Sequence, residues 1–257
     1  MTPEDTLAPN RYGRLCAEVY DLDKPTGSLF DIAYYAARLR DLEGTILEAA
    51  VGTGRLMIPL LEAGIAIEGF DHSAEMLAIC AARAQGRGLS PVLTQARFQD
   101  LALGRQFAAI IVPASSFMLL DRFDEALEAL GRLYDHLEPG GRLLVDLPPM
   151  SAFDGQPPER SWTAANGDLL TLRSSRAETD VIGQRRVHHD RYERWRDGRL
   201  VETEIERFAY RLWGMEEFRF ALAAAGFSDI TVSANYRPGR QPKPGDQILN
   251  FEAVRSG

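Results

Sequence analysis

The chain has 257 residues, of which 45% are hydrophobic and 26% charged, a composition typical of folded globular proteins and unlike that of disordered or collagen-like chains. Its 29 basic and 37 acidic residues give a formal net charge of −8, which argues against a surface that binds nucleic acid by neutralising phosphates. The first ten residues lack a signal-peptide pattern and no apolar run is long enough to span a membrane, so we expect a soluble, cytoplasmic protein.

Cysteine usage limits the chemistry further. The two cysteines, Cys16 and Cys80, are far apart and form no CxxC spacing. We therefore expect neither a disulfide framework nor a zinc site, and no other metal site is predicted.

Between residues 44 and 145, short apolar runs alternate with helical stretches, which predicts βαβ units and a parallel sheet. Residues 46–51 predict a buried strand, and a glycine turn then leads into a helix over 55–63. The next strand, 65–70, ends at Asp71, and Ser73 is placed to cap the helix that follows. Further strands are predicted at 92–98, 107–112 and 142–147, the last after a Pro-Gly-Gly turn at 139–141, and a further helix at 124–137.

The pattern changes after Pro149. Residues 160–211 lack helical periodicity and carry turn signals at 166–167 and 197–198, which predicts two hairpins in a small antiparallel sheet. A helix at 215–225 and strands at 230–232 and 248–254 close the chain. The predicted organisation is lid helices in 1–40, a cofactor-binding core in 41–150, an inserted lobe in 151–213 and the rest of the core in 214–257.

A glycine-rich turn between a strand and a helix lets backbone N–H groups approach a nucleotide-like cofactor closely. The dinucleotide fingerprint would need a third glycine where Met57 stands, and the chain has no phosphate-binding GK[ST] motif. Both absences weaken the hypothesis of an NAD- or NTP-binding site. A nicotinamide-dependent oxidoreductase and a non-catalytic cofactor-binding protein are kept as the alternative hypotheses.

Residues 47–55, together with Asp71, Asp100 and the turn within 137–141, resemble the class I S-adenosylmethionine-dependent methyltransferases. The family's first motif runs acidic-x-G-x-G-x-G, so Glu48, Gly52 and Gly54 match it and Ala50 replaces its first glycine. The resemblance implies an α/β fold with a doubly wound, Rossmann-like seven-stranded sheet whose last strand is antiparallel. It also implies S-adenosyl-L-methionine as the cofactor.

Carried over by position, the resemblance assigns the methionine part of the cofactor to the loop at 52–54, the ribose to Asp71 and the adenine to Asp100 and Leu101. The roughly 20-residue spacing from the glycine turn also fits a ribose-binding carboxylate at Asp71, although this residue could instead cap the next helix. Glu48 could support the loop rather than touch the ligand. The predicted cofactor contacts are Glu48, Ala50, Gly52, Thr53, Gly54, Asp71, His72, Met76, Asp100, Leu101 and Pro113.

The acceptor of the methyl group is expected beyond the carboxyl ends of the strands, near 113–117 and 146–149. The DxPP string at 146–149 follows the fifth strand and ends in Met150, unlike the N/D-P-P-Y motif of DNA and protein amino-methyltransferases, so a small-molecule acceptor is favoured. The inserted lobe resembles that of amino-sugar and small-amine N-methyltransferases, where it would cover the pocket or form a dimer interface. The predicted substrate contacts are Tyr20, Ser115, Ser116, Phe117, Asp146 and Tyr192.

Strand alternation puts His188 and Tyr192 on one face of the lobe and His189 on the other, so either face could present a base. The predicted catalytic residues are His188, His189 and Tyr20; a solvated hairpin and a packed lid helix are the alternatives. The predicted function is methyl transfer from S-adenosylmethionine to nitrogen or oxygen of a small metabolite, in natural-product or amino-sugar biosynthesis. The expected partners are the small substrate and, through the lobe, a second copy of the chain, with neither nucleic acid nor membrane.

Overall fold

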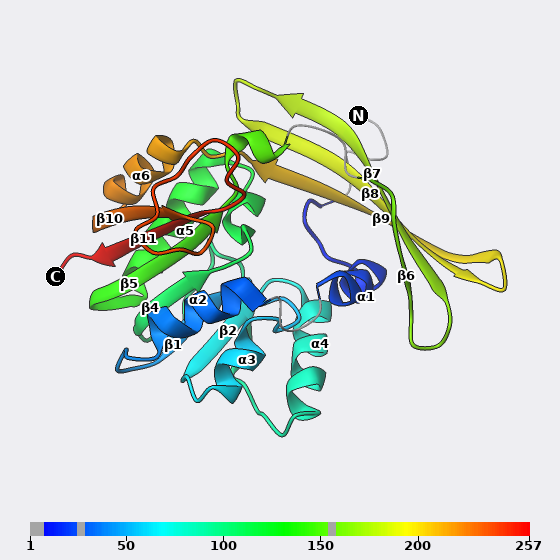
Figure 1. Ribbon diagram of the computed structural model, residues 1–257, viewed down its shortest axis with the longest axis horizontal. Coiled ribbons are helices and arrows are strands. Elements are labelled where there is room, and N and C mark those ends of the chain that lie inside the picture. The colour runs from blue at the N-terminus through cyan, green and yellow to red at the C-terminus, as the bar shows by residue number, and fades with distance from the viewer. Residues whose placement is uncertain (1–7, 25–28, 154–157) are drawn as a thin grey trace.

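Two separate sheets organise the chain in the computed structural model, which describes residues 8–24, 29–153 and 158–257 (Figure 1). The larger sheet has the order β10-β11-β5-β4-β1-β2-β3, and β11 runs antiparallel to both of its neighbours. The predicted α/β fold with an antiparallel last strand is therefore confirmed. The strands of this sheet are β1 (Ile46–Ala49), β2 (Ile67–Asp71), β3 (Leu93–Gln95), β4 (Phe107–Val112), β5 (Leu137–Leu147), β10 (Phe227–Ala234) and β11 (Leu249–Arg255).

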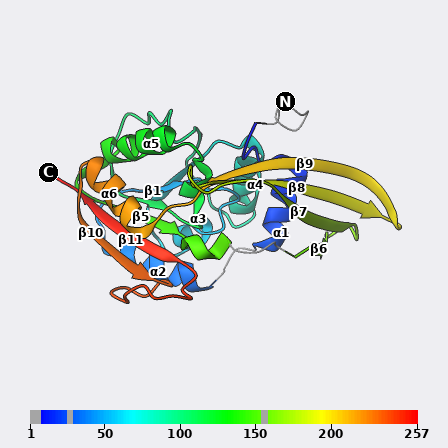
Figure 2. The same cartoon turned by 90° about the horizontal axis from the view of Figure 1, so that it is seen from above.

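Helices cover both faces of this sheet (Figure 2). Buried side chains of α2 (Leu29–Leu39), α3 (Met57–Glu62) and α4 (Ala74–Gln85) pack in one apolar cluster, and those of α5 (Phe123–Asp135) and α6 (Met215–Ala224) pack in another. All six residues of β4 are buried, as expected for a parallel strand covered on both sides. The uninterrupted apolar run that predicted this strand thus reflects its central position.

The boundary between α5 and β5 differs from the predicted one. The helix ends at Asp135 and β5 begins at Leu137, so the turn predicted at 139–141 lies within the strand. There the pairing with β4 skips from Leu137 to Arg142, which makes residues 138–141 a bulge. The proline and glycines mark this irregularity rather than a strand boundary.

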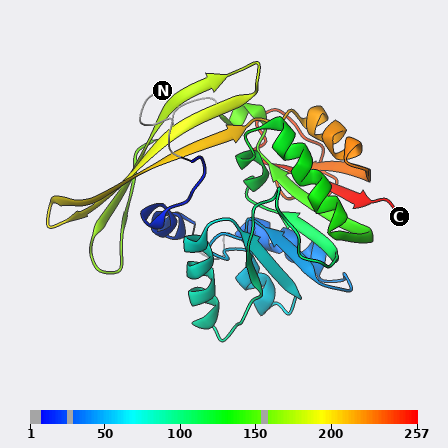
Figure 3. The same ribbon diagram turned by 180° about the vertical axis from the view of Figure 1, so that it is seen from behind.

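The smaller sheet is the inserted lobe, which extends away from the core (Figure 3). Its strands are β6 (Arg160–Thr163), β7 (Leu169–Asp180), β8 (Arg185–Arg196) and β9 (Arg199–Arg211), joined in chain order as a meander. The two predicted turns are present, but a third joins β7 to β8 at 181–184, so the prediction of two hairpins was incomplete. Val181 and Ile182, which are 81% and 98% exposed, form part of this turn and gave no polar turn signal.

Helix α1 (Arg14–Asp23) packs against the lobe, where Leu15 and Val19 share an apolar cluster with Leu172. Two lobe carboxylates meet the amides at the start of this helix. Oε1 of Glu206 accepts from the amide of Gly13 at 2.9 Å, and Oε1 of Glu204 accepts from the amide of Cys16 at 2.9 Å. Because the first amides of a helix have no partner within it, the lobe supplies the cap that α1 lacks.

Two short 3-10 helices complete the described elements, at Ser116–Leu119 (η2) and Met150–Phe153 (η3). Of the described helices, none is long and apolar enough to cross a membrane. Both cysteines are unpaired and buried, and the described residues contain no group of three or more His, Cys, Asp or Glu side chains arranged to hold a metal.

Candidate functional site

The loop after β1 passes through left-handed backbone conformations. Ala50, Gly52 and Gly54 have φ values of +54°, +56° and +77°. A Cβ at Gly54 would lie 2.6 Å from Sγ of Cys80, so glycine is needed here for both the backbone angle and the contact with α4. A Cβ at Gly52 would have no atom nearer than 4.0 Å. The backbone at Gly52 therefore faces open space that a ligand can approach.

The carboxylate of Asp71, at the end of β2, ties this loop to the next helix. Its Oδ2 accepts from the amide of Gly52 at 2.9 Å, and its Oδ1 accepts from the amide of Ser73 at 2.9 Å. Burial raises the pKa of Asp71, and these amide hydrogen bonds oppose that rise. The cap of α4 is Ser73, whose Oγ accepts from the amide of Met76. Asp71 therefore remains available to the space in front of the loop.

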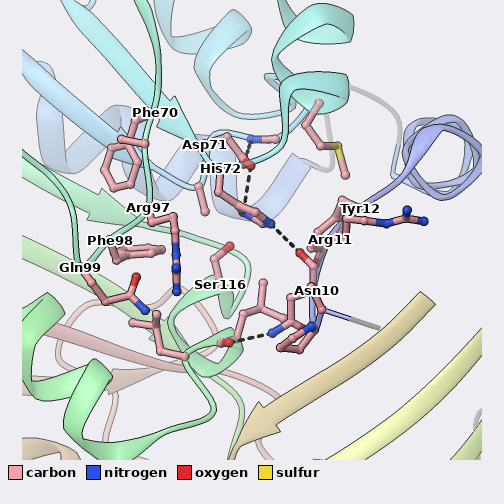
Figure 4. A pocket seen from close by; sticks show the side chains of 18 of the residues that line it. Asn10, Arg11, Tyr12, Phe70, Asp71, His72, Arg97, Phe98, Gln99 and Ser116 are labelled. Atoms are coloured by element: carbon pink, nitrogen blue, oxygen red, sulfur yellow. Dashed lines mark hydrogen bonds and ion pairs between the residues drawn. The ribbon is translucent and has the colours of Figure 1, made fainter. Parts of the chain in front are cut away.

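A cavity of about 400 Å³ opens at this edge of the sheet, within the range of small-molecule sites (Figure 4). Its floor and walls come from the glycine loop, the ends of β2 and β3, η2 and the start of α5, and its roof from the N-terminal segment. The lining residues are Ala8, Pro9, Asn10, Arg11, Tyr12, Tyr20, Ala50, Gly52, Phe70, Asp71, His72, Met76, Ala96, Arg97, Phe98, Gln99, Ser116, Leu119, Leu120, Asp121 and Glu125.

Asn10 fixes the roof by joining the lobe to the core. Its side-chain amide donates to the carbonyls of Leu119 and Ala209, at 2.8 and 3.0 Å, and accepts from the amide of Ala209 at 3.0 Å. Its own carbonyl lies 2.6 Å from Nε2 of His72 (Figure 4). One buried side chain thus holds the roof to β9 on one side and η2 on the other.

Seven of the predicted site residues meet around this cavity. They include residues that were predicted to form the glycine loop, to contact the ribose and to contact the methyl acceptor. They are Tyr20, Ala50, Gly52, Asp71, His72, Met76 and Ser116. Burial raises the pKa of Tyr20 to about 12, so its phenol stays neutral at physiological pH.

Other predicted cofactor contacts lie outside the cavity lining. Thr53 and Gly54 lie in the loop and Pro113 follows β4, and none of the three lines the cavity. Asp100 is exposed, and Leu101 is fully buried in the apolar core. In their place Phe98 and Gln99 enter the cavity, because β3 ends at Gln95 rather than at 98.

The predicted acceptor contacts other than Tyr20 and Ser116 are also separate from the lining. Phe117 is in the core, and Ser115 has φ of +63° at the start of η2. Asp146 is buried and accepts from Asn250 at 2.7 Å and from the Tyr236 hydroxyl at 3.0 Å. Burial raises the pKa of Asp146 to about 6. This carboxylate joins β5 to β11.

The lobe histidines lie on opposite faces of β8. His188 shares the buried face with Tyr192, and its ring contacts that of Tyr210 at 5.8 Å. A row of aromatic rings continues from Tyr210 through Phe208 to Tyr12 at the roof. Burial and the nearby Arg186 and Arg176 lower the pKa of His188, so it is neutral at pH 7.

Glu48 is buried in β1 beneath the glycine loop, and burial raises its pKa to about 8. Its Oε2 has no hydrogen-bond partner in the part of the chain that the structure describes. Arg55, the nearby cation, is instead paired with Asp31 of α2. An acceptor atom is therefore available directly under the loop.

The segment that forms the roof and the residues at the end of β3 were missed by the sequence analysis. Asn10 and Tyr12 both have positive φ, at +57° and +55°, and the Pro9-Asn10 pair is a turn signal that was not used in the sequence predictions. Their place over the cavity depends on contacts with residues more than 60 positions away. The pattern of neighbouring residues in the sequence gives no indication of contacts with residues so far away.

Comparisons with known proteins agree with this geometry. A family model described as a methyltransferase domain matches residues 46–141. A putative methyltransferase from Bacillus subtilis (strain 168) is 25% identical over 83% of this chain and 85% of its own length. The dTDP-3-amino-3,6-dideoxy-alpha-D-glucopyranose N,N-dimethyltransferase of Streptomyces fradiae is 32% identical over 52% of this chain and 54% of its own. The solved structure of an amino pentose methyltransferase from Micromonospora echinaspora, with S-adenosylmethionine bound, covers 97% of this chain and 100% of its own at a TM-score of 0.68 and 19% identity.

Proposed function

Because the chain belongs to the class I S-adenosylmethionine-dependent methyltransferases, we propose that it methylates the amine nitrogen of a small, sugar-like acceptor. The family membership replaces the two alternatives considered above, an oxidoreductase and a non-catalytic protein. The amine acceptor is supported by the 32% identical relative, which is named for methylation of an amino sugar.

The described residues fit the cofactor. Gly52 leaves open space in front of the loop, and the carboxylate of Asp71 lies beside it as an acceptor for ribose hydroxyls. Met76 and Phe98 offer apolar surface for the base. Beneath the loop, the unpartnered Oε2 of Glu48 would accept from the ammonium of the methionine part once that positive charge ionises the carboxyl. Backbone, carboxylate and apolar groups thus occur in the order that this molecule requires.

When bound, S-adenosylmethionine supplies a methyl group on a sulfonium sulfur, which leaves as a neutral thioether. Such a displacement needs alignment above all, since the leaving group requires no assistance. Asp71 and the loop hold the nucleoside, and the neutral phenol of Tyr20 lines the opposite wall. The roof residues Asn10 and Tyr12 cover this region.

The engagement of the cavity's titratable groups is the observation that carries the amine proposal. Nε2 of His72 lies 2.6 Å from the carbonyl of Asn10, and Asp121 is paired with Arg185 at 2.5 Å. Asp71 accepts two backbone amides. A hydroxyl acceptor needs a base to take its proton, whereas a neutral amine attacks without one. Because the carboxylates that line the cavity are already hydrogen-bonded or ion-paired, the cavity suits an amine better than a hydroxyl.

The acceptor would bind between η2 and the lobe. Ser116 lines the cavity from η2, and the aromatic row from Tyr12 to Tyr210 continues the wall toward His188. Neutral His188 would accept a hydrogen bond from the acceptor through Nε2, which has no described partner. Association of two copies through the lobe stays a prediction, which light scattering tests.

The test uses S-adenosylmethionine with a deuterated methyl group and a matched pair of acceptors. One is a dTDP-linked 3-amino-6-deoxy sugar, and the other is the same sugar with a hydroxyl at position 3. Mass spectrometry should find the labelled methyl on the amino sugar alone. Labelling of the hydroxy sugar, or of neither compound, would contradict the proposed acceptor.

A further inference from the structure

Lys24, at the end of α1, is one of only two lysines in the chain, the other being Lys243, and neither takes part in the proposed function. Helix α1 lies between the lobe and α4 (Figure 1). At its last turn the amide of Lys24 donates to the carbonyl of Tyr20 at 2.9 Å. The Nζ atom lies over the ring of the same tyrosine, 4.6 Å from the ring centroid. A residue that lines the cavity therefore contacts both the backbone and the amine of Lys24.

Tyr20 stands close to the groups that would hold two parts of S-adenosylmethionine. The charges of Asp71, at the ribose side, and of Glu48, beneath the glycine loop, both act on its phenol. The sulfonium sulfur joins the ribose to the methionine part, so the methyl group that it carries would lie between these two carboxyl groups. An amine held on the ring of Tyr20 is therefore near the transferable methyl group.

The surroundings of Lys24 favour its neutral form. Its amine is in no ion pair with the described residues, and the adjacent carboxylate of Asp23 is paired with Arg160 of β6 at 2.8 Å. Partial loss of hydration lowers the pKa of Lys24, and the charges of Arg55 and Arg160 lower it further, while Asp23 opposes the shift. A bound sulfonium would add another positive charge beside it. Because only the neutral amine carries a free lone pair, a lysine among cations is a better nucleophile than an ordinary surface lysine.

We propose that the chain methylates itself at Nζ of Lys24. The lone pair of the neutral Nζ forms a bond to the methyl carbon of S-adenosylmethionine while the carbon–sulfur bond breaks, and the electron pair of that bond stays on the sulfur of S-adenosylhomocysteine. The methylated nitrogen then loses a proton to water. Lys24 is exposed, so its flexible side chain has room to turn from the ring of Tyr20 to the methyl group. The proposal rests on S-adenosylmethionine as the cofactor and is independent of the proposed acceptor.

Incubation with S-adenosylmethionine that carries a deuterated methyl group, without any acceptor, tests the transfer. Mass spectrometry of the peptides should find the label on Lys24. Lys243, which is exposed in the loop between β10 and β11 and does not line the cavity, should stay unlabelled. The initial rate per molecule should not depend on protein concentration, because the amine and the bound cofactor belong to the same chain.

Two arginine variants are a matched pair. Lys24→Arg keeps a positive charge at the end of α1 but replaces the amine by a guanidinium that stays protonated, so the label should be lost. Lys243→Arg should be labelled on Lys24 to the same extent as the unaltered protein.

Acetylation of the two lysines, with and without S-adenosylhomocysteine, tests the position of Lys24 without turnover. The bound ligand should cover the amine beside Tyr20, so Lys24 should lose reactivity while Lys243 keeps it. Calorimetry on the same sample shows whether the ligand is bound, and absence of binding would overturn the cofactor assignment together with the proposal.

In protein that binds the ligand, three results would overturn the proposal alone. The first is a Lys24 that carries no label, and the second is equal labelling of Lys243 or labelling of a histidine instead. The third is acetylation of Lys24 at the same rate with and without the ligand.

Discussion

Oε1 of Glu206, in the lobe, accepts a hydrogen bond from the amide of Gly13 at the start of α1, at 2.9 Å. The same oxygen lies 2.9 Å from Nη2 of Arg11. Together with Glu204, this carboxylate anchors the helix that carries Tyr20 into the cavity. The lobe thus contacts the cavity through α1, although β8 and β9 contribute no lining residue.

Replacing this carboxylate should loosen α1. Glu206→Ala leaves the amide of Gly13 buried without its acceptor, which typically costs about 1 to 3 kcal/mol. We expect a lower midpoint of urea unfolding and weaker binding of S-adenosylhomocysteine. Asp197→Asn, in the exposed turn between β8 and β9, is the control and should change neither. An unaltered unfolding curve for Glu206→Ala would show that the contact contributes nothing.

Asp71→Ala should weaken the cofactor complex by about 10- to 100-fold, the usual range for loss of hydrogen bonds to a charged group. Calorimetry with S-adenosylhomocysteine measures this directly. Because Asp71 also accepts from Gly52 and Ser73, thermal unfolding of the variant must be recorded beside it. Unchanged affinity in a folded variant would remove Asp71 from the ribose site.

Glu48 makes folding stability depend on pH. Burial raises its pKa from 4.5 to about 8, so between these values the folded chain holds a proton that the unfolded chain has lost. The contribution of the protonated Glu48 side chain to folding stability is fully present below pH 4.5 and is lost as the pH rises through about 8. Glu48→Gln removes the titration, so its stability relative to the unaltered protein should rise from about pH 5 to about pH 9. If the urea-unfolding midpoints of the two proteins differ by the same amount at every pH in that range, the raised pKa of Glu48 is contradicted.

His188 and His189 form a matched pair on opposite faces of one strand. His188→Ala should raise the KM for the acceptor and leave the affinity for S-adenosylhomocysteine unchanged, because its ring lies at the lobe end of the aromatic row. His189→Ala, on the other face, should alter neither value. The placement of the acceptor against the lobe fails if the two variants have the same kinetics.

The sequence was sufficient where one local pattern decides the structure. The apolar run of β4, the left-handed glycine loop and the carboxylate at the end of β2 all follow from short stretches of chain. Gly52 and Asp71, both predicted as cofactor contacts, lie together because successive parallel strands end at the same edge of a sheet.

The features that the sequence did not predict depend on where strands end and on contacts between residues far apart in the chain. A strand predicted to reach residue 98 ends at Gln95, so the bend that follows turns Phe98 and Gln99 inward and leaves Asp100 exposed. The third lobe turn passes through the apolar Val181 and Ile182, which gave no turn signal. The roof needed Asn10 to pair with β9, a contact across 199 positions.

The crystal structure of the protein with S-adenosylhomocysteine tests the central claim most directly. We expect the ribose hydroxyls within hydrogen-bond distance of Asp71 and the adenine beside Phe98. The thioether should point to the space between Tyr20 and the lobe. Ligand bound elsewhere, with the cavity beneath Asn10 closed or filled by side chains, would contradict the account.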